Sequence, residues 1–140
     1  MELDSNAHSV FLLCYHLVLV VKYRREVFDD AVSGRAKEIF EYIAPNYKIT
    51  LMEWNHDKDH IHIVFRAHPR TEISKFINAY KSASSRLIKK EFPSVRQKLW
   101  KEHFWSQSFC LLTAGGAQLE VLDKYIESQG ERTYTERGKH

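Results

Sequence analysis

The hydrophobic and polar positions of the chain first describe a buried strand and then a helix. Residues 9–21 form a nearly continuous apolar run that is rich in β-branched side chains, and the charged segment 22–26 ends it. Asp29 and Asp30 stand where a helix would begin, and the spacing of the following apolar residues predicts a helix to about Ile43. The chain is therefore expected to open with a strand and a helix.

Two shorter strands are predicted next, and they form a hairpin. Residues 47–54 alternate roughly between apolar and polar positions, residues 55–59 are polar, and residues 60–67 (HIHIVFRA) alternate again. Two strands joined by so short a loop are most simply antiparallel. Because side chains alternate across a strand, His60 and His62 are expected on one face, about 6–7 Å apart at their base, with the intervening apolar residues facing the core.

The longest periodic segment is an amphipathic helix over residues 72–91, with Thr71 as its predicted N-cap. Its apolar arc consists of Ile73, Phe76, Ile77, Tyr80, Leu87 and Ile88. Its opposite arc consists of Lys75, Arg86, Lys89 and Lys90, with Lys81 at the flank. The pattern predicts one core-facing side and one basic side, and Pro93 marks the end of the helix.

The last part of the chain is predicted to add one strand and one helix. An irregular aromatic segment contains Trp100, Phe104 and Trp105, of which at least two are expected in the core. A strand over 108–114 follows, then a break at Gly115 and Gly116, then a helix over 117–129. The remaining residues, 131–140, form a polar tail.

This order of elements, β-α-β-β-α-β with an appended C-terminal helix, predicts an α+β fold with an antiparallel sheet. It is the ferredoxin-like arrangement that RNA-recognition domains also use. Residues 1–140 are expected to form a single domain with its core between about residues 8 and 130. Because the fold hosts many functions, the function has to be inferred from the site.

Composition narrows the class of protein. A chain of 140 residues with 44% hydrophobic and 13% aromatic side chains has room for one packed core and is unlike a disordered chain. The net charge of +3 is a mild excess that does not by itself indicate nucleic acid. Cys14 and Cys110 lie in apolar runs, and neither a secretory signal nor a membrane-spanning run is found. We therefore expect reduced thiols in a cytoplasmic protein that does not act at a membrane.

The pair His60 and His62 is the first candidate site. Two imidazoles on one face of a strand can converge on a metal ion or a phosphate, although a bare H-x-H pair is more often two partly exposed histidines without a ligand. The softness of imidazole favours zinc, manganese or nickel over magnesium. Cys14 and Cys110 do not complete a structural zinc site, so an open metal site is the better metal hypothesis.

The last helix is the second candidate. Tyr125 and Gln129 are four residues apart and therefore share a helical face, beside an apolar stripe of Leu119, Leu122 and Ile126. A tyrosine in this position is usually an amphipathic edge residue. Gln129 is a less usual companion, because its neutral oxygen could ligate a hard cation.

Basic residues are the third candidate, as contacts to phosphates. We select Lys22, Arg24, Arg25, Lys81 and Arg86, although a solvated helix face is the common explanation for such a stripe. No phosphate-binding loop, dinucleotide motif or G-x-S-x-G elbow is found in the sequence. An activity of this chain is therefore expected to use no nucleotide cofactor.

Taken together, these motifs resemble the HUH-type single-tyrosine transposases (TnpA) of small bacterial and archaeal insertion sequences. H-x-H followed by Gly-Gly and then Y-x-x-x-Q, at these intervals, is a specific combination. The matching segments are residues 15–25, 57–65, 77–93, 99–100 and 111–129, and the resemblance covers about residues 8–130.

The resemblance implies a role for each of these residues. His60, His62 and Gln129 would ligate a divalent metal, for which the family suggests Mg2+ or Mn2+ in place of the softer ions. Tyr125 would be the nucleophile that forms a 5′-phosphotyrosine link with DNA. Gly115 and Gly116 would form a hinge.

The resemblance also implies a substrate and a partner. The substrate would be single-stranded DNA with hairpins at the element ends, and the protein would act as a homodimer whose tyrosine helices can serve the partner's histidine pair. Three alternatives stay open: a non-catalytic nucleic-acid-binding domain, a metal-dependent hydrolase of small substrates, and a domesticated, repeat-associated relative that no longer mobilises its own element.

Overall fold

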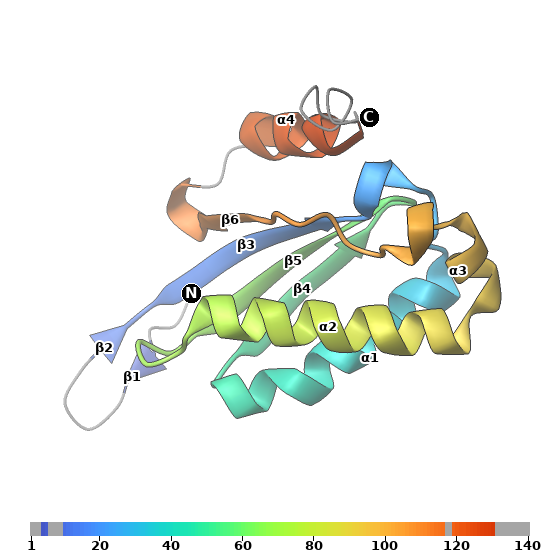
Figure 1. Ribbon diagram of the computed structural model, residues 1–140. Coiled ribbons are helices and arrows are strands. Elements are labelled where there is room, and N and C mark those ends of the chain that lie inside the picture. Colours follow the sequence, from blue (N-terminus) through green and yellow to red (C-terminus); the bar gives the residue numbers. More distant parts are fainter. Residues whose placement is uncertain (1–3, 6–9, 117–118, 131–140) are drawn as a thin grey trace.

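The structure is a computed structural model and describes residues 4–5, 10–116 and 119–130. A four-stranded antiparallel sheet forms its centre, in the order β4-β5-β3-β6 (Figure 1). The strands are β3 (Leu13–Val20), β4 (Thr50–His56), β5 (His60–Ala67) and β6 (Cys110–Thr113). A separate two-stranded hairpin pairs β1 (Asp4–Ser5) with β2 (Val10–Phe11). The predicted polar tail, 131–140, lies outside the described residues.

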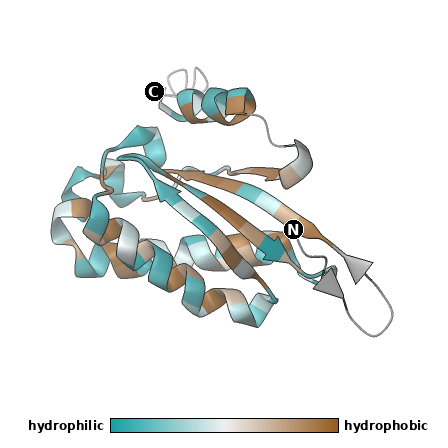
Figure 2. Ribbon diagram, turned by 180° about the vertical axis from the view of Figure 1, so that it is seen from behind, coloured by the Kyte–Doolittle hydropathy of each residue, from teal (hydrophilic) through white to brown (hydrophobic). Residues whose placement is uncertain are grey.

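The helices cover both faces of this sheet. The bounds of the long helices are α1 (Asp30–Ile43), α2 (Ile73–Glu91) and α4 (Leu119–Gly130). Helices α1 and α2 lie side by side on one face, and α4 lies over β3 and β6 on the other (Figure 1, Figure 2). The predicted β-α-β-β-α-β order with an appended helix is therefore confirmed.

Helix α1 begins where the sequence predicts. The side chain of Asp29 accepts a hydrogen bond from the backbone N–H of Val32 at 2.9 Å, so it satisfies one of the unpaired donors of the first turn.

Helix α2 corrects one prediction, because Thr71 is not its N-cap. The residue in that position is Glu72, whose side chain makes no capping bond. The hydroxyl of Thr71 instead donates to the carbonyl of Tyr47 at 2.7 Å and accepts from the N–H of His68 at 3.1 Å. Backbone groups other than those of the first turn of α2 occupy the Thr71 hydroxyl, so it is not available as a cap. The bond to Tyr47 ties the start of α2 to the segment before β4.

Short elements connect the main ones. Their bounds are η1 (Lys22–Arg24), η2 (Ala44–Tyr47), α3 (Pro93–Lys98), η3 (Trp100–Glu102) and η4 (Ala114–Gly116). Helix α3 is not predicted from the sequence. Pro93 both ends the preceding helix and occupies the first turn of the new one, where a missing N–H costs nothing.

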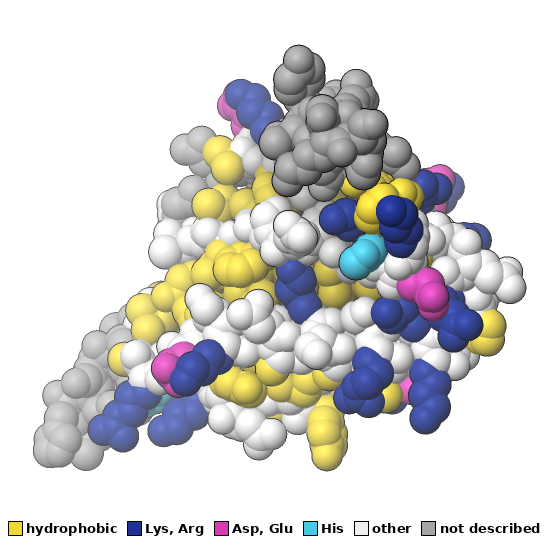
Figure 3. All heavy atoms as spheres, in the orientation of Figure 1, with side chains coloured by type: hydrophobic (Ala, Val, Ile, Leu, Met, Phe, Trp, Pro, Cys, Tyr) yellow, Lys and Arg dark blue, Asp and Glu magenta, His cyan; other side chains and the backbone are white. Residues whose placement is uncertain are grey.

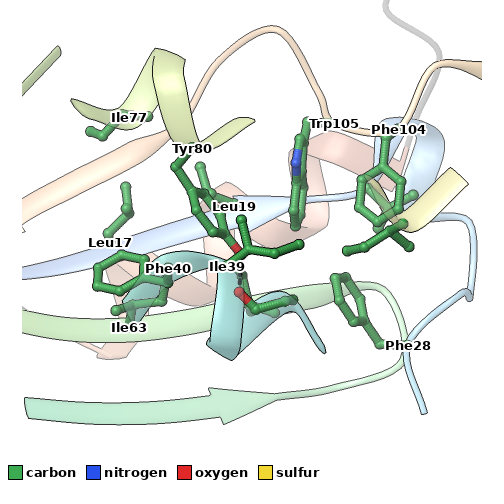
Figure 4. Packing of buried hydrophobic residues seen from close by; sticks show 14 of the residues in the cluster. Leu17, Leu19, Phe28, Ile39, Phe40, Ile63, Ile77, Tyr80, Phe104 and Trp105 are labelled. Carbon is green, nitrogen blue, oxygen red and sulfur yellow. Dashed lines mark hydrogen bonds between the residues drawn. The ribbon is translucent and has the colours of Figure 1, made fainter. Parts of the chain in front are cut away.

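The main core fills the space between the sheet and the pair α1–α2 (Figure 4). Tyr80 is fully buried there and its hydroxyl donates to the carbonyl of Ala36 at 2.9 Å. The indole N–H of Trp105 donates to Ser84 at 2.9 Å. Phe104 and Trp105 are buried, as expected for two of the three aromatic residues of this segment, and Trp100 is half-buried. Buried polar groups are thus paired inside the apolar core, which keeps their desolvation cost low.

A second, smaller apolar cluster holds α4 on the sheet. It joins Val18, Val20, Cys110 and Leu122, with Leu112, Tyr125 and Ile126 packed around them. Both cysteines are free and buried, so the prediction that they lie in the core is confirmed. Among the described helices, none combines the length and the apolar character needed to cross a membrane.

Candidate active site

The strand register places the histidine pair on the face of the sheet that carries α4. In the antiparallel pairing of β3 with β5, Val20 lies opposite His60 and Val18 lies opposite His62. Directly paired residues project to the same face of a sheet. Because Val18 and Val20 also belong to the cluster beneath α4, the two imidazoles and the tyrosine helix share one face.

His60 is held by an acidic neighbour. Its Nδ1 lies 2.7 Å from Oδ1 of Asp59, and Oδ2 of Asp59 accepts from Nε of Arg24, also at 2.7 Å. Burial alone would raise the pKa of Asp59, but the hydrogen bonds from His60 and Arg24 outweigh it and hold the pKa below its ordinary value. Asp59 is therefore a carboxylate at neutral pH, and Nδ1 of His60 is the donor.

His62 is paired with a third histidine. Its Nε2 lies 2.8 Å from Nδ1 of His16, and the two ring centroids are 5.0 Å apart. Burial, followed by the proximity of His16 and then His60, lowers the pKa of His62. At neutral pH this imidazole is neutral, which is the form that binds metals.

The sequence analysis does not single out His16 as a site residue, because His16 lies inside the apolar run 9–21. The available signal was periodicity. His16, Val18 and Val20 alternate along β3, so a polar residue two positions from Val18 belongs to the face of the histidine pair.

Tyr125 and Gln129 face the loop before β6. The hydroxyls of Tyr125 and Ser108 lie 2.9 Å apart, and the hydroxyl of Ser108 donates to Oε1 of Gln129 at 3.5 Å. The pKa of Tyr125 is raised above its ordinary value, mainly by burial. The hydrogen bond with Ser108 offsets part of this rise, and Cys110 adds to it. The phenol is therefore protonated at neutral pH. Sequence spacing gave no signal for Ser108, which lies 17 positions from Tyr125.

The histidine pair fits a divalent metal by its donor set. Asp59 holds a hydrogen of His60 on Nδ1, so in the neutral ring Nε2 offers a lone pair to a metal ion. His62 is neutral, and a metal ion bound through its Nε2 would replace the contact with His16. Within residues 4–5, 10–116 and 119–130, no three His, Cys, Asp or Glu side chains are grouped for metal binding.

The predicted hinge residues lie where β6 ends. Gly115 and Gly116 belong to η4, and a Cβ added to Gly115 would meet no atom within 4 Å. Residues 117 and 118, which complete the connection to α4, lie outside the described residues. The hinge stays a prediction.

The five basic residues selected from the sequence have different surroundings. Arg24 pairs with Asp59, Arg25 is exposed, and the Lys22 ammonium lies 5.5 Å from the ring centroids of both Tyr23 and Trp100.

Lys81 has a structural position. Its ammonium donates to the carbonyls of Ser106 and Gln107 at 2.7 and 3.2 Å, and burial lowers its pKa. This geometry gives no support to the prediction that Lys81 contacts DNA.

Arg86 is exposed. In Figure 3, Lys and Arg side chains gather over the C-terminal part of α2. Arg86 lines a shallow hollow of about 490 Å³ at the end of α2 with Lys89, Lys90 and Arg96, and Glu102 in the same lining pairs with Arg96 at 3.0 Å. We call the four basic residues the basic hollow.

Three comparisons place the chain among known proteins. A family model described as "Transposase IS200 like" matches residues 9–129. The chain is 33% identical over 132 residues to the ISDra2 transposase TnpA of Deinococcus radiodurans, covering 94% of each protein. It matches the crystal structure of a Deinococcus radiodurans protein assigned as a transposase with a TM-score of 0.80 and 30% identity, over 92% of this chain and 99% of the other.

A more distant structure shares the fold. A REP-associated tyrosine transposase bound to a REP hairpin matches with a TM-score of 0.57 over 91% of this chain and 69% of the other. At 8% identity, this similarity concerns the fold alone.

Proposed function

Because the chain belongs to the family of IS200-like transposases, we propose that it cleaves and rejoins single-stranded DNA at the ends of an insertion sequence through a 5′-phosphotyrosine intermediate. The resemblance noted from the sequence is thereby confirmed at the level of the family. One observation carries the proposed chemistry: His60 and His62 project from the same face of the sheet on which α4 carries Tyr125.

Tyr125 is the proposed nucleophile. Its phenolic oxygen forms a bond to the scissile phosphorus while the bond from phosphorus to the 3′ oxygen breaks. The 5′ end of one DNA segment is then linked to the protein, and the other segment leaves with a 3′-hydroxyl. The phenolic proton has to depart during the attack, because the raised pKa of Tyr125 keeps the phenol protonated at neutral pH.

Ser108 orients this nucleophile. Its hydroxyl lies within hydrogen-bond distance of the phenol and also donates to the amide oxygen of Gln129. The contact fixes the phenolic oxygen above the sheet before DNA binds, which lowers the entropic cost of reaching the reactive geometry.

His60, His62 and Gln129 are the proposed metal ligands, with Mg2+ or Mn2+ as the ion. When bound, such an ion polarises a phosphoryl oxygen and offsets the charge that develops during the displacement. The two imidazoles are presented by one strand, so β5 fixes their separation. Gln129 comes from the same helical face as Tyr125, so ligand and nucleophile move together with α4.

Rejoining requires no nucleotide. The phosphotyrosine conserves the energy of the broken ester, so an incoming 3′-hydroxyl can attack the same phosphorus and release Tyr125. We propose that this reaction takes place in the cytoplasm on a homodimer, and that the tyrosine helix can serve either subunit.

The test of this function is the formation of a covalent adduct. The protein is incubated with labelled single-stranded DNA from the flanks of its own gene, with Mg2+ or Mn2+ or with a chelator, and the products are separated on a denaturing gel. We expect a retarded, metal-dependent band with single-stranded DNA and none with the duplex. Binding without any adduct, on both strands and with both metals, would favour a non-catalytic DNA-binding domain.

We also propose that the basic hollow binds the phosphates of a hairpin stem. The structure of the REP-associated tyrosine transposase, which was determined bound to a REP hairpin, motivates this assignment. Three of its four cations extend from one side of α2, and Ser82 and Ser85 add hydroxyl donors beside them. Lysine, arginine and serine side chains are among the groups that commonly contact the phosphates of a DNA duplex.

Replacing Arg86 by glutamine is expected to reduce the salt dependence of hairpin binding. Loss of one phosphate contact makes the slope of log K against log salt less steep by about 0.9, with a similar effect on hairpins of different sequence. The measurement is fluorescence anisotropy with a labelled hairpin at several salt concentrations. Lys48→Gln is the matched control, because Lys48 is exposed at the opposite end of α2, next to η2. Equal slopes for both variants would remove Arg86 from the DNA-binding surface.

A further inference from the structure

Asp59 is a buried carboxylate for which the proposed chemistry has no role. It is 8% exposed, and it is one of few polar residues buried to this degree in the described part of the chain. Both of its oxygens are in use, Oδ1 with Nδ1 of His60 and Oδ2 with Nε of Arg24, each at 2.7 Å. A buried carboxylate in a short loop is costly unless such partners compensate for its lost hydration.

The contact with His60 determines which ring nitrogen faces outward. A carboxylate can only accept hydrogen bonds, so Nδ1 of His60 has to carry the hydrogen. In the neutral imidazole the remaining nitrogen, Nε2, has a free lone pair, and the ring cannot rotate without breaking the bond to Asp59. Carboxylates that hold a histidine in this way commonly orient the ligands of metal sites.

The backbone fixes Asp59 as firmly as its side chain does. Its carbonyl accepts from the N–H of Val21 at 2.9 Å, and the neighbouring carbonyl of Lys58 accepts from Val27 and Phe28 at 3.0 and 2.9 Å. The turn that precedes β5 is therefore tied to the chain that follows β3. Asp59 sits at a defined position from which one carboxylate can reach both partners.

Arg24 donates to Oδ2 of Asp59, and the backbone of Arg24 has an unusual conformation. It lies in the left-handed region with a φ of 53°, next to Tyr23 with a φ of 56°. Its side chain also passes against the end of α4, where a Cβ added to Gly130 would lie 2.6 Å from Cδ of Arg24. Arg24 thus stands between the histidine pair and the last residue of the tyrosine helix.

We propose that Asp59 is a positioning residue that holds His60 with Nε2 directed toward the metal, and that Arg24 acts through Asp59. The proposal rests on the metal-binding role given to His60 above. Asp59 touches neither DNA nor metal in this scheme. Its effect is to hold the ring in one orientation and one tautomer, so that the ligand is in place before the ion arrives.

The first test observes the ring directly, without metal or DNA. Long-range proton–nitrogen spectra of the labelled full-length protein at neutral pH are expected to show His60 with its hydrogen on Nδ1. In Asp59→Ala we expect this pattern to be lost, and the His60 ring to give the signals of a mixture of the Nδ1–H and Nε2–H tautomers. An unchanged His60 pattern in Asp59→Ala, or a wild-type ring with its hydrogen on Nε2, overturns the proposal whatever the metal does.

The second test measures Mn2+ affinity by calorimetry on the DNA-free protein. Asp59→Ala is expected to weaken binding by about 10- to 100-fold. Asp59→Asn, which keeps the shape of the side chain, should lie between, because its single oxygen can serve His60 or Arg24 and not both. Asp57→Ala is the matched control in the same turn, since Asp57 is exposed and bonds to the backbone N–H of Lys58. Equal affinity in all variants overturns the positioning role.

Arg24 is tested by combination with Asp59. Arg24→Gln is expected to weaken Mn2+ binding in the wild-type background and to add nothing in Asp59→Ala, because its influence passes through that carboxylate. The same loss in both backgrounds would show that Arg24 acts independently. If the wild type and His60→Ala bind Mn2+ equally, the proposed metal site is wrong, whereas the spectra of the first test still decide whether Asp59 orients the ring.

Discussion

Replacing Tyr125 by phenylalanine is expected to abolish the covalent adduct with single-stranded DNA. The change removes one oxygen and leaves the ring in the apolar cluster beneath α4, so folding and DNA binding should persist. Because phosphotyrosine formation needs the phenolic oxygen, cleavage should fall by at least about a thousandfold, as for other removed nucleophiles. The measurement is the denaturing gel described above, with DNA binding recorded in parallel.

Tyr42→Phe is the matched control for this variant. Tyr42 is 84% exposed on α1, on the other side of the sheet from α4, so the same chemical change there should leave the adduct unaltered. An adduct of undiminished yield in Tyr125→Phe would show that another residue is the nucleophile. Loss of the adduct together with loss of DNA binding would instead indicate that α4 had been displaced.

Replacing His60 or His62 by alanine is expected to reduce DNA cleavage by a similar factor, because the metal ion is no longer held. Stabilisation of a phosphoryl oxygen by a metal ion is worth several kcal/mol, which corresponds to a loss of cleavage on the order of a thousandfold. Both histidines lie on the face of β5 that carries α4, so Ile61 between them keeps its packing in the main core. Single-turnover cleavage at increasing Mn2+ concentration measures the effect, and a chelator should reproduce it in the wild type.

His103→Ala is the control for the two histidine variants. His103 is exposed and stacks on Trp100 at a centroid distance of 5.7 Å, in a different segment from the histidine pair. We expect its metal dependence to equal that of the wild type. If His60→Ala and His62→Ala cleave at the wild-type rate in saturating Mn2+, the pair is not the metal site. If only the Mn2+ concentration for half-maximal cleavage rises, a single histidine suffices to hold the ion.

The site residues that could be predicted are those whose relation is local in sequence. His60 and His62 share a face because a strand alternates its side chains, and Tyr125 and Gln129 share a face because a helix returns after about four residues. Both relations hold in the structure. The family resemblance then assigns their chemistry, since spacing alone allows two unligated histidines and an ordinary amphipathic tyrosine.

The prediction that Thr71 caps α2 is wrong and the DNA contact of Lys81 stays a prediction, and both side chains have partners that the local pattern does not reveal. The periodicity of α2 places Lys81 at the flank of a basic arc, but its ammonium finds two carbonyls of the segment before β6. Thr71 precedes α2 as an N-cap would, but its hydroxyl finds the carbonyl of Tyr47. In both cases a partner distant in sequence competes successfully for a flexible polar group.

The sequence by itself determined the order of the main elements and the faces of β5 and α4. Periodicity and turn residues act within a few positions, so these features need no knowledge of the remaining chain. The tertiary structure alone decided which segments meet on the second face of the sheet. The β3–β5 register brings His16 to His62, the turn before β5 brings Asp59 to Arg24, and the packing of α4 brings Tyr125 to Ser108. Those contacts depend on strand register and helix docking, which are set by burial of the whole apolar surface and not by any local pattern.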